Sequence, residues 1–317
     1  MIQVHRCPVC DSVGLRRLKT YTFKRPKKST GGDSRHREDR ARQCLEIFFN
    51  EIVQGSDTCD MAVDMCPTCG FVFANPKLTA GDIEAKYRAI EKLEAASPHA
   101  PAIRTTERSR RIERLVSSCS GPSVGLRVLD YGGAEGNNLE PFAYRNSCFV
   151  VDFIEYQLPE GVGYLGRDLT DLEADERFDL ILLCHVLEHA AEPTDLVRSL
   201  ASLLAPGGFL YVEVPMGVAT EWRRIREPLT HFNYFSEQSL ARCIRESGLS
   251  LLHVSTEYQW VARSRSWCVN VICMKGNHGA PEVASVKSTR RSMLTPGYYL
   301  PAVLGYLGRH LRTLRSS

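Results

Sequence analysis

The 317-residue sequence has no apolar run approaching the roughly 18 residues that a membrane-crossing helix requires. Its first residues, Met-Ile-Gln-Val-His-Arg-Cys, lack the apolar core of a secretory signal. The formal net charge of +3 is too small to indicate a nucleic-acid or membrane partner by itself. We therefore expect a cytoplasmic protein. Its 43% hydrophobic content suffices for a sizeable core, and its length suggests about two domains.

Cysteine is abundant, at twelve residues, but its spacing does not suggest a disulfide framework. Four cysteines form two Cys-x-x-Cys pairs, Cys7 with Cys10 and Cys66 with Cys69. The two-residue gap lets both thiolates of a tight turn face one ion, and four thiolates complete a closed tetrahedral site. The sequence therefore predicts a structural Zn²⁺ ion. A redox pair or unligated thiols are the alternatives, and the long gap leaves Cys44 and Cys59 open as competing ligands.

Four regions differ in composition and predict the domain organisation. Residues 1–76 carry the cysteine pairs and a basic insert over 16–42, which we interpret as a solvated loop rather than a phosphate-binding surface. Residues 77–123 predict a helical connector with an N-cap at Thr79. Residues 124–276 form the main domain. Residues 277–317 predict a linker and a basic amphipathic tail, which either packs on the protein or contacts an anionic membrane peripherally.

Short apolar runs alternate with helical patterns in the main domain. Buried strands are predicted at 127–130, 148–152, 178–184 and 209–215. Helices are predicted at 135–144, 193–204 and 237–246. The last helix is followed by two strand-like runs without a helix between them, 249–258 and 267–275, which predict a hairpin. This order predicts an α/β fold whose parallel sheet is covered on both faces and ends in antiparallel strands.

A glycine-rich turn follows the first strand and contains Gly132, Gly133 and Gly136 directly after Asp130. Glycine lets the backbone turn tightly and approach a ligand outside the carboxyl ends of parallel strands. The Asp130 carboxylate can accept hydrogen bonds from the amine of an amino-acid moiety. Asp152, about 20 residues on, ends the next strand, where an acid can receive both ribose hydroxyls. A tight turn without a ligand, or an NAD site, is the alternative, but a carboxylate before the glycines disfavours a pyrophosphate.

These motifs, in this order, resemble the class I S-adenosylmethionine (SAM) dependent methyltransferases over residues 105–275. The matching segments are 128–136, Asp152, 166–169, 178–189 and 204–210. The resemblance implies a Rossmann-like seven-stranded methyltransferase sheet with a terminal antiparallel hairpin, plus a small N-terminal zinc-binding module. It also implies that SAM is bound by Asp130, Gly132, Gly133, Gly136, Asp152, Asp168, Leu169, Cys184 and His185. Ala134 stands where the family usually has glycine, a change that we expect to be tolerated.

The resemblance assigns roles within this set. The glycine turn with Asp130 holds the methionine portion, Asp152 holds the ribose, and Asp168 with Leu169 flanks adenine. Cys184 and His185 line the floor of the pocket. His189 follows at helical spacing with Glu188 before it, and we expect these histidines to line the cofactor pocket rather than to bind a metal.

The catalytic residue is expected after the fifth strand, and His231 is the leading candidate because imidazole titrates near neutrality. The segment 231–236 resembles the Glu-His-Leu-Ser-Tyr-Phe-type segment of zinc-containing sugar C-methyltransferases, in which Glu and His act in substrate deprotonation. Thr230 stands at the Glu position and cannot serve as a base, so hydroxyl methylation is at least as favoured as carbon methylation. An anchoring or cofactor-packing role for His231 is the alternative.

The segment 71–76 strengthens a further resemblance, to the amino-terminal zinc module of methyltransferases that act on sugars, glycans and natural products. We therefore predict a SAM-dependent methyltransferase for a sugar, glycan or related small-molecule acceptor, with no nucleic-acid partner. The alternatives are a protein or natural-product acceptor, and a non-catalytic SAM-binding or assembly protein. The sequence contains no Asn/Asp-Pro-Pro-aromatic turn after 178–184 and no Pro-Cys pair, which disfavours amide, adenine and cytosine methylation.

Overall fold

The computed structural model describes residues 1–27, 36–95, 106–121, 124–219, 221–261 and 264–275, so the predicted tail over 277–317 lies outside the described residues. The helices are α1 (His36–Ile47), α2 (Ala80–Ala95), α3 (Thr106–Ser120), α4 (Pro193–Ser202) and α5 (Glu237–Glu246). The short turns are η1 (Phe48–Val53), η2 (Asn137–Leu139), η3 (Leu169–Asp171), η4 (Leu187–His189), η5 (Gly217–Ala219) and η6 (Glu221–Arg223). The strands are β1 (Arg16–Lys24), β2 (Thr58–Met65), β3 (Val72–Asn75), β4 (Arg127–Tyr131), β5 (Ser147–Val151), β6 (Val162–Gly166), β7 (Phe178–Cys184), β8 (Leu204–Pro215), β9 (Asn233–Tyr234), β10 (Leu249–Val261) and β11 (Ser264–Lys275).

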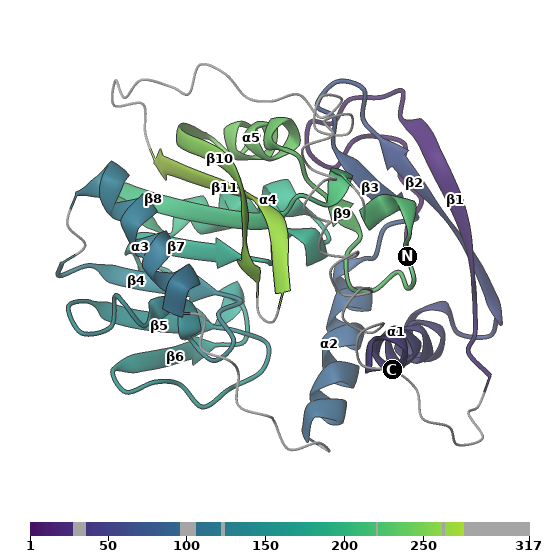
Figure 1. The fold of residues 1–317 in the computed structure, drawn as a ribbon, viewed down its shortest axis with the longest axis horizontal. Coiled ribbons are helices and arrows are strands. Elements are labelled where there is room, and N and C mark those ends of the chain that lie inside the picture. The colour runs from purple at the N-terminus through teal and green to yellow at the C-terminus, as the bar shows by residue number, and fades with distance from the viewer. Residues whose placement is uncertain (28–35, 96–105, 122–123, 220, 262–263, 276–317) are drawn as a thin grey trace, which may run out of the picture.

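Within these residues the main sheet has seven strands in the order β10-β11-β8-β7-β4-β5-β6 (Figure 1). Strands β4 to β8 are parallel to one another, whereas β11 is antiparallel to β8 and to β10. The predicted α/β fold with a terminal antiparallel hairpin is therefore confirmed. The carboxyl ends of β4, β5 and β7 meet at one edge of the sheet, where parallel α/β sheets bind their ligands.

The two faces of the sheet are covered because apolar side chains alternate along the central strands. One face packs against α3 through Ile112, Val116, Val128, Leu180 and Leu182. The other face packs against α4 and α5 through Leu129, Ile181, Leu183, Val197, Leu200 and Leu240. Consecutive residues of β4 and β7 thus belong to different cores, and the sheet is rigid enough to hold side chains at its carboxyl edge.

A second sheet, formed in the described chain by β1-β2-β3-β9, contains the amino-terminal strands. The strand β9 comes from the main part of the chain, directly after His231, and pairs antiparallel with β3 through Tyr234–Val72 and Asn233–Phe73. Figure 1 shows β9 beside β3, at the edge of the second sheet. The interpretation of the basic insert over 16–42 as a loop is wrong for Arg16–Lys24, which forms β1 along β2, and for residues 36–42, which lie in α1.

The local structure agrees with the sequence-based prediction at the start of α2 and differs from it after the glycine turn. Thr79 caps α2 as predicted, because Thr79 Oγ1 accepts from Asp82 N (3.2 Å) and Thr79 N donates to Asp82 Oδ2 (2.8 Å). The helix predicted at 135–144 is reduced to η2 followed by turns, since Gly136 has a left-handed φ of 70°. None of the described helices is long and apolar enough to cross a membrane.

Candidate active site

A cavity of about 360 Å³ opens at the carboxyl ends of β4, β5 and β7, within the range typical of small-molecule sites. Its lining residues are Ala80, Ile83, Tyr87, Tyr131, Gly132, Val151, Asp152, Phe153, Arg167, His185, Val186, His189, Ala190, Ala191, Glu192 and Leu196. The helix α2 contributes one wall, where Tyr87 stacks on Phe153 with ring centroids 4.7 Å apart and planes 7° from parallel. Of the residues predicted to bind SAM, the structure places Gly132, Asp152 and His185 in the wall of this cavity.

At two positions of the glycine turn, neighbouring side chains leave room only for a glycine. A Cβ atom on Gly132 would lie 2.5 Å from Val186 Cγ2, and one on Gly133 would lie 2.7 Å from Asp130 Cγ. Both separations are shorter than Cβ contacts in proteins. Ala134 follows with a φ of 46°, so the alanine at this position is accommodated with backbone strain.

Asp130 lies behind the turn and is completely buried. Its Oδ2 accepts a hydrogen bond from Asn138 Nδ2 (3.0 Å), whereas Oδ1 has no hydrogen-bond partner among the described residues. Burial raises the pKa of Asp130 to about 7, although the bond from Asn138 and the charge of Arg108 oppose the shift. A nearby cationic group stabilises the ionised form of a buried carboxyl. The amine of the predicted amino-acid moiety is such a group.

Asp152 is the first residue after β5, and its side chain contacts the glycine turn. Its Oδ2 accepts from Ala134 N (2.9 Å), and its Oδ1 accepts from Ile154 N (3.1 Å). The side chain therefore has a fixed orientation at the cavity wall, as a residue that receives ribose hydroxyls requires.

The other predicted binding residues lie outside the lining set of the cavity. Asp168 caps η3, where its Oδ1 accepts from Thr170 N (2.7 Å), and Leu169 packs against the core. Cys184 is buried at the end of β7, and burial raises the pKa of its thiol well above the ordinary value. Gly133 and Gly136 shape the turn from behind. Their contacts with SAM, and those of Asp168, Leu169 and Cys184, stay predictions.

A buried ion network lies beside the cavity and centres on Glu213 of β8, which is fully buried. Its carboxylate accepts from Arg108 Nε (2.9 Å), from Arg111 Nη2 and from Tyr211 Oη (2.7 Å). His185 Nε2 lies 2.9 Å from Glu213 Oε1, and the His185 backbone has a left-handed φ of 58°. Burial would lower the pKa of His185, but contacts with Cys268, Glu188 and Glu213 raise it well above its ordinary value.

Beside the cavity, two loops bring Glu188, His189 and His231 together, and of the three only His189 is among the residues that line it. Glu188 Oε1 lies 3.8 Å from His189 Nε2 and 3.9 Å from His231 Nε2. His231 Nδ1 lies 2.9 Å from Glu221 Oε2. Burial alone would lower the pKa of His231, but the bond to Glu221 and the Glu188 charge raise it.

The loop that carries His231 is held by buried polar contacts. Asn233 Nδ2 donates to the carbonyl oxygens of Leu187 (2.9 Å) and Ala190 (2.8 Å), on both sides of His189. Phe232 N donates to Glu188 O (3.3 Å). His231 and His189 are therefore fixed relative to each other, with ring centroids 5.0 Å apart.

The four cysteines predicted to bind zinc also converge. Cys7 Sγ lies 3.5 Å from Cys69 Sγ, and Cys10 Sγ lies 3.6 Å from Cys66 Sγ. All four sulfur atoms lie within 4.8 Å of one another. Zn–S bonds of about 2.3 Å place tetrahedral sulfur atoms about 3.8 Å apart, so the donor set fits a zinc ion.

Cys44 and Cys59 stand outside this four-sulfur group in the described structure. The Cys44 thiol lies 3.8 Å from the hydroxyl of Thr230, and Cys59 faces Phe23 across the β1–β2 pair. Neither is therefore a competing ligand here.

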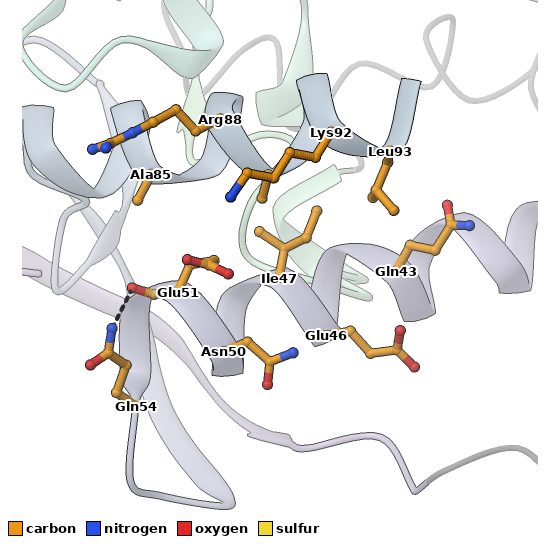
Figure 2. A pocket seen from close by; sticks show the side chains of 11 residues that line it. Gln43, Glu46, Ile47, Asn50, Glu51, Gln54, Ala85, Arg88, Lys92 and Leu93 are labelled. Carbon is orange, nitrogen blue, oxygen red and sulfur yellow. Dashed lines mark hydrogen bonds between the residues drawn. The ribbon is translucent and has the colours of Figure 1, made fainter. Parts of the chain in front are cut away.

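A second cavity, of about 500 Å³, lies between α1–η1 and α2 (Figure 2). Its walls carry long polar and charged side chains from the helix surfaces, among them Glu46, Glu51, Arg88 and Lys92. It is distant in the fold from the carboxyl edge of the main sheet and lacks the glycine turn. We therefore place the candidate active site in the first cavity.

The sequence did not predict the charged side chains that surround this site. Arg108 and Arg111 are three residues apart on α3, and Glu213 interrupts an otherwise apolar strand. An acid inside a buried strand is a signal for a buried ion pair, but the arginines are about a hundred residues away in the sequence. Glu221 carried no sequence signal.

Comparison with known proteins identifies a methyltransferase domain in the main part of the chain. Residues 104–254 match a family model described as a methyltransferase domain. The ubiquinone biosynthesis O-methyltransferase of Caulobacter sp. (strain K31) is 34% identical over 104 residues, which are 29% of this chain and 41% of that protein. The protein of the same name from Xanthomonas euvesicatoria pv. vesicatoria (strain 85-10) is 31% identical over 157 residues, 42% of this chain and 66% of that protein.

Among solved structures, the Burkholderia thailandensis 1,6-didemethyltoxoflavin-N1-methyltransferase, with 1,6-didemethyltoxoflavin and S-adenosylhomocysteine bound, is 16% identical with a TM-score of 0.49. That alignment covers 68% of this chain and 96% of the other. The chain spans 41% of the Caulobacter relative and 66% of the Xanthomonas relative, less than two thirds of each.

Proposed function

We propose that the chain, whose residues 104–254 match a family model described as a methyltransferase domain, is a class I SAM-dependent methyltransferase that transfers the methyl group of SAM to a hydroxyl of a small-molecule acceptor. One observation carries the proposal. The cavity at the carboxyl edge of the sheet has the glycine turn and Asp152 in one part of its wall and two histidines, His185 and His189, in another. A cofactor site and a set of polar groups for an acceptor thus share one space.

Two arguments favour an oxygen acceptor. Thr230 replaces the glutamate that accompanies the histidine in the sugar C-methyltransferases that this segment resembles. The relatives named above are O-methyltransferases. Two acceptor classes merit comparison, namely sugars, which the cysteine module favours, and intermediates of ubiquinone biosynthesis, which the names of the relatives suggest.

Bound SAM would supply an electrophilic methyl carbon on its sulfonium sulfur, so the protein mainly aligns the acceptor oxygen and helps to remove its proton. The turn at Gly132 and Gly133, with Asp130 and Asp152, would hold the cofactor. SAM would supply the methyl group for the new C–O bond as its S–C bond breaks, and would leave as S-adenosylhomocysteine. His231, held by Glu221, assists departure of the hydroxyl proton to solvent.

We also propose that Cys7, Cys10, Cys66 and Cys69 bind a structural zinc ion, because four thiolates leave no position for substrate. The ion would fix the amino-terminal loop on the main domain. Thr194 Oγ1 of α4 lies 3.4 Å from the carbonyl oxygen of Val9, inside the first cysteine pair.

Calorimetric titration of SAM into the full chain tests the cofactor site. Wild type is expected to bind, Asp152→Ala at least about tenfold more weakly, and Glu176→Gln like wild type, since Glu176 pairs with Arg127 at the opposite end of β4. Absence of binding by wild type would overturn the proposal. Turnover on a panel of sugars and phenols should fall about 10²- to 10⁴-fold in His231→Gln. SAM binding without turnover would favour a non-catalytic SAM-binding protein.

A further inference from the structure

The cluster beside the cavity has the composition of a metal site. One ligand atom from each of Glu188, His189 and His231 lies within 4.8 Å of the other two. Imidazole nitrogens with a carboxylate oxygen are a donor set that divalent transition metals prefer. A tetrahedral ion with bonds of about 2.1 Å holds its ligand atoms about 3.4 Å apart. The distances of 3.8 and 3.9 Å from Glu188 need only a small inward movement to match.

The Glu188 side chain is buried with one close ion-pair partner, His185. It is 1% exposed, and neither of its carboxylate oxygens has a hydrogen-bond partner among the described residues. The nearest cationic group is His185, whose Nδ1 lies 3.3 Å from Oε1 and whose Nε2 is already directed at Glu213. A buried carboxylate without hydrogen bonds is costly, so a cation between Glu188 and the other two ligands would satisfy it.

Glu221 adds a second, independent observation. Its Oε2 lies 2.9 Å from His231 Nδ1, so Nδ1 donates to this carboxylate. The other ring nitrogen, Nε2, is left toward Glu188 Oε1, 3.9 Å away. Metal-binding histidines usually donate their second nitrogen to a carboxylate in this way. The arrangement is that of a metal ligand with its outer carboxylate.

We propose that Glu188, His189 and His231 bind a divalent transition-metal ion beside the cavity, which His189 lines. This revises the expectation that His189 only lines the cofactor pocket. Three protein ligands leave positions open for an oxygen of the acceptor. Resting on the proposed function, the ion would bind the acceptor hydroxyl and promote loss of its proton to solvent, so that His231 assists deprotonation as a ligand.

The test uses the full chain with zinc loaded at the four cysteines, titrated with Co²⁺ and followed by absorption and calorimetry. Wild type is expected to take up one further equivalent, with visible d–d bands and without a thiolate-to-cobalt charge-transfer band. Glu188→Gln should weaken Co²⁺ binding at least about 100-fold, and Glu221→Gln, at an outer position, about 10- to 100-fold. Asp195→Asn is the control, because Asp195 is an acid on nearby α4 that pairs with Arg198 and lies outside the cavity lining, and this variant should bind Co²⁺ like wild type.

Glu221 is 35% exposed, so Glu221→Gln keeps the test valid even if Glu188→Gln does not fold. Uptake of no further Co²⁺ by wild type, or uptake only with the thiolate band, would overturn the metal site. Equal affinities of wild type and both variants would overturn it as well. Methyl transfer that persists without this ion would leave the proposed function standing. Failure to bind SAM despite normal Co²⁺ uptake would overturn the proposed function alone.

Discussion

Replacing Glu213 by glutamine should strongly destabilise the protein, because the substitution leaves two arginines buried without a counter-charge. Glu213 is fully buried, and the side chains of Arg108 and Arg111 that bind it are 13% and 14% exposed. Removing one partner of a buried ion pair costs about 3–5 kcal/mol. That is a large share of the roughly 5–15 kcal/mol by which folded proteins are stable.

Urea unfolding followed by circular dichroism measures the effect. With a slope of about 2–3 kcal/mol/M, the midpoint should fall by about 1–2.5 M. The matched control is Glu257→Gln, which removes a more exposed partner of the same Arg111, 3.6 Å from its Nη1 and 37% exposed. This control should lose less than about 1 kcal/mol. If both variants lose the same amount, the buried network does not stabilise the fold as argued.

The pH dependence of the same measurement follows from the pKa shifts. Burial alone would raise the pKa of Glu213, but Arg108, His185 and Arg111 hold it well below its ordinary value. A lowered folded pKa gives stability that is present above the unfolded value of about 4.3 and is lost as the pH falls through the folded pKa. The difference between wild type and Glu213→Gln should therefore shrink in strong acid. A constant difference down to acid unfolding would contradict this account.

Three further perturbations test the turn and the cysteine group. Gly133→Ala places a Cβ 2.7 Å from Asp130 Cγ and should weaken SAM binding at least about tenfold by calorimetry. The control Gly81→Ala, where a Cβ has room, should bind SAM like wild type. Equal SAM affinity of the two variants would contradict the steric argument. Ala134→Gly relieves a φ of 46° and should raise the free energy of unfolding by about 0.5–1 kcal/mol; a loss would show that the turn is not strained. Cys69→Ser should reduce bound zinc from about one ion per chain to a small fraction, and unchanged zinc by metal analysis would refute the four-thiolate site.

Local pattern in the sequence predicts most of the main sheet, since its strands are buried on both faces and read as continuous apolar runs. The strand β6 escaped prediction because Gly163 and Gly166 interrupt it and all of its side chains are partly exposed. The turn after β4 was read as a helix because its composition is helical, whereas Gly136 and the Asn138–Asp130 bond hold it in another conformation. Periodicity does not report such tertiary contacts.

The candidate site, too, has residues that the sequence predicts and residues that it does not. Residues of the glycine turn and Asp152 lie next to their strands, so sequence alone places them at the cavity. Glu188 meets His231 across 43 positions, through a loop whose course depends on buried bonds from Asn233. The pairing of Glu221 with His231 depends on that same loop. Those contacts, and any metal they hold, become visible only when the fold brings the two loops together.

The loop that carries His231 is held from both sides, which links the amino-terminal module to the acceptor side of the cavity. From β3 of the module, Ala74 N donates to Phe232 O (2.8 Å), and from α2 of the connector, Lys86 Nζ donates to Leu229 O (2.8 Å). From the main domain, the backbone of Phe232 donates to the carbonyl of Glu188. Lys86 is buried, and burial lowers its pKa to about 8. Its position therefore depends on the packing of the module around it.

The glycine turn and Asp152, by contrast, are held by bonds within the main domain, such as that from Ala134 N to Asp152 Oδ2. Loss of the cysteine-bound ion should consequently disturb the acceptor side before the cofactor side. In Cys69→Ser protein that remains folded, turnover should fall more than SAM affinity, since the second sheet supports His231 through β9 but does not reach the turn. Equal losses of turnover and SAM affinity would mean that the module supports the whole domain rather than this loop.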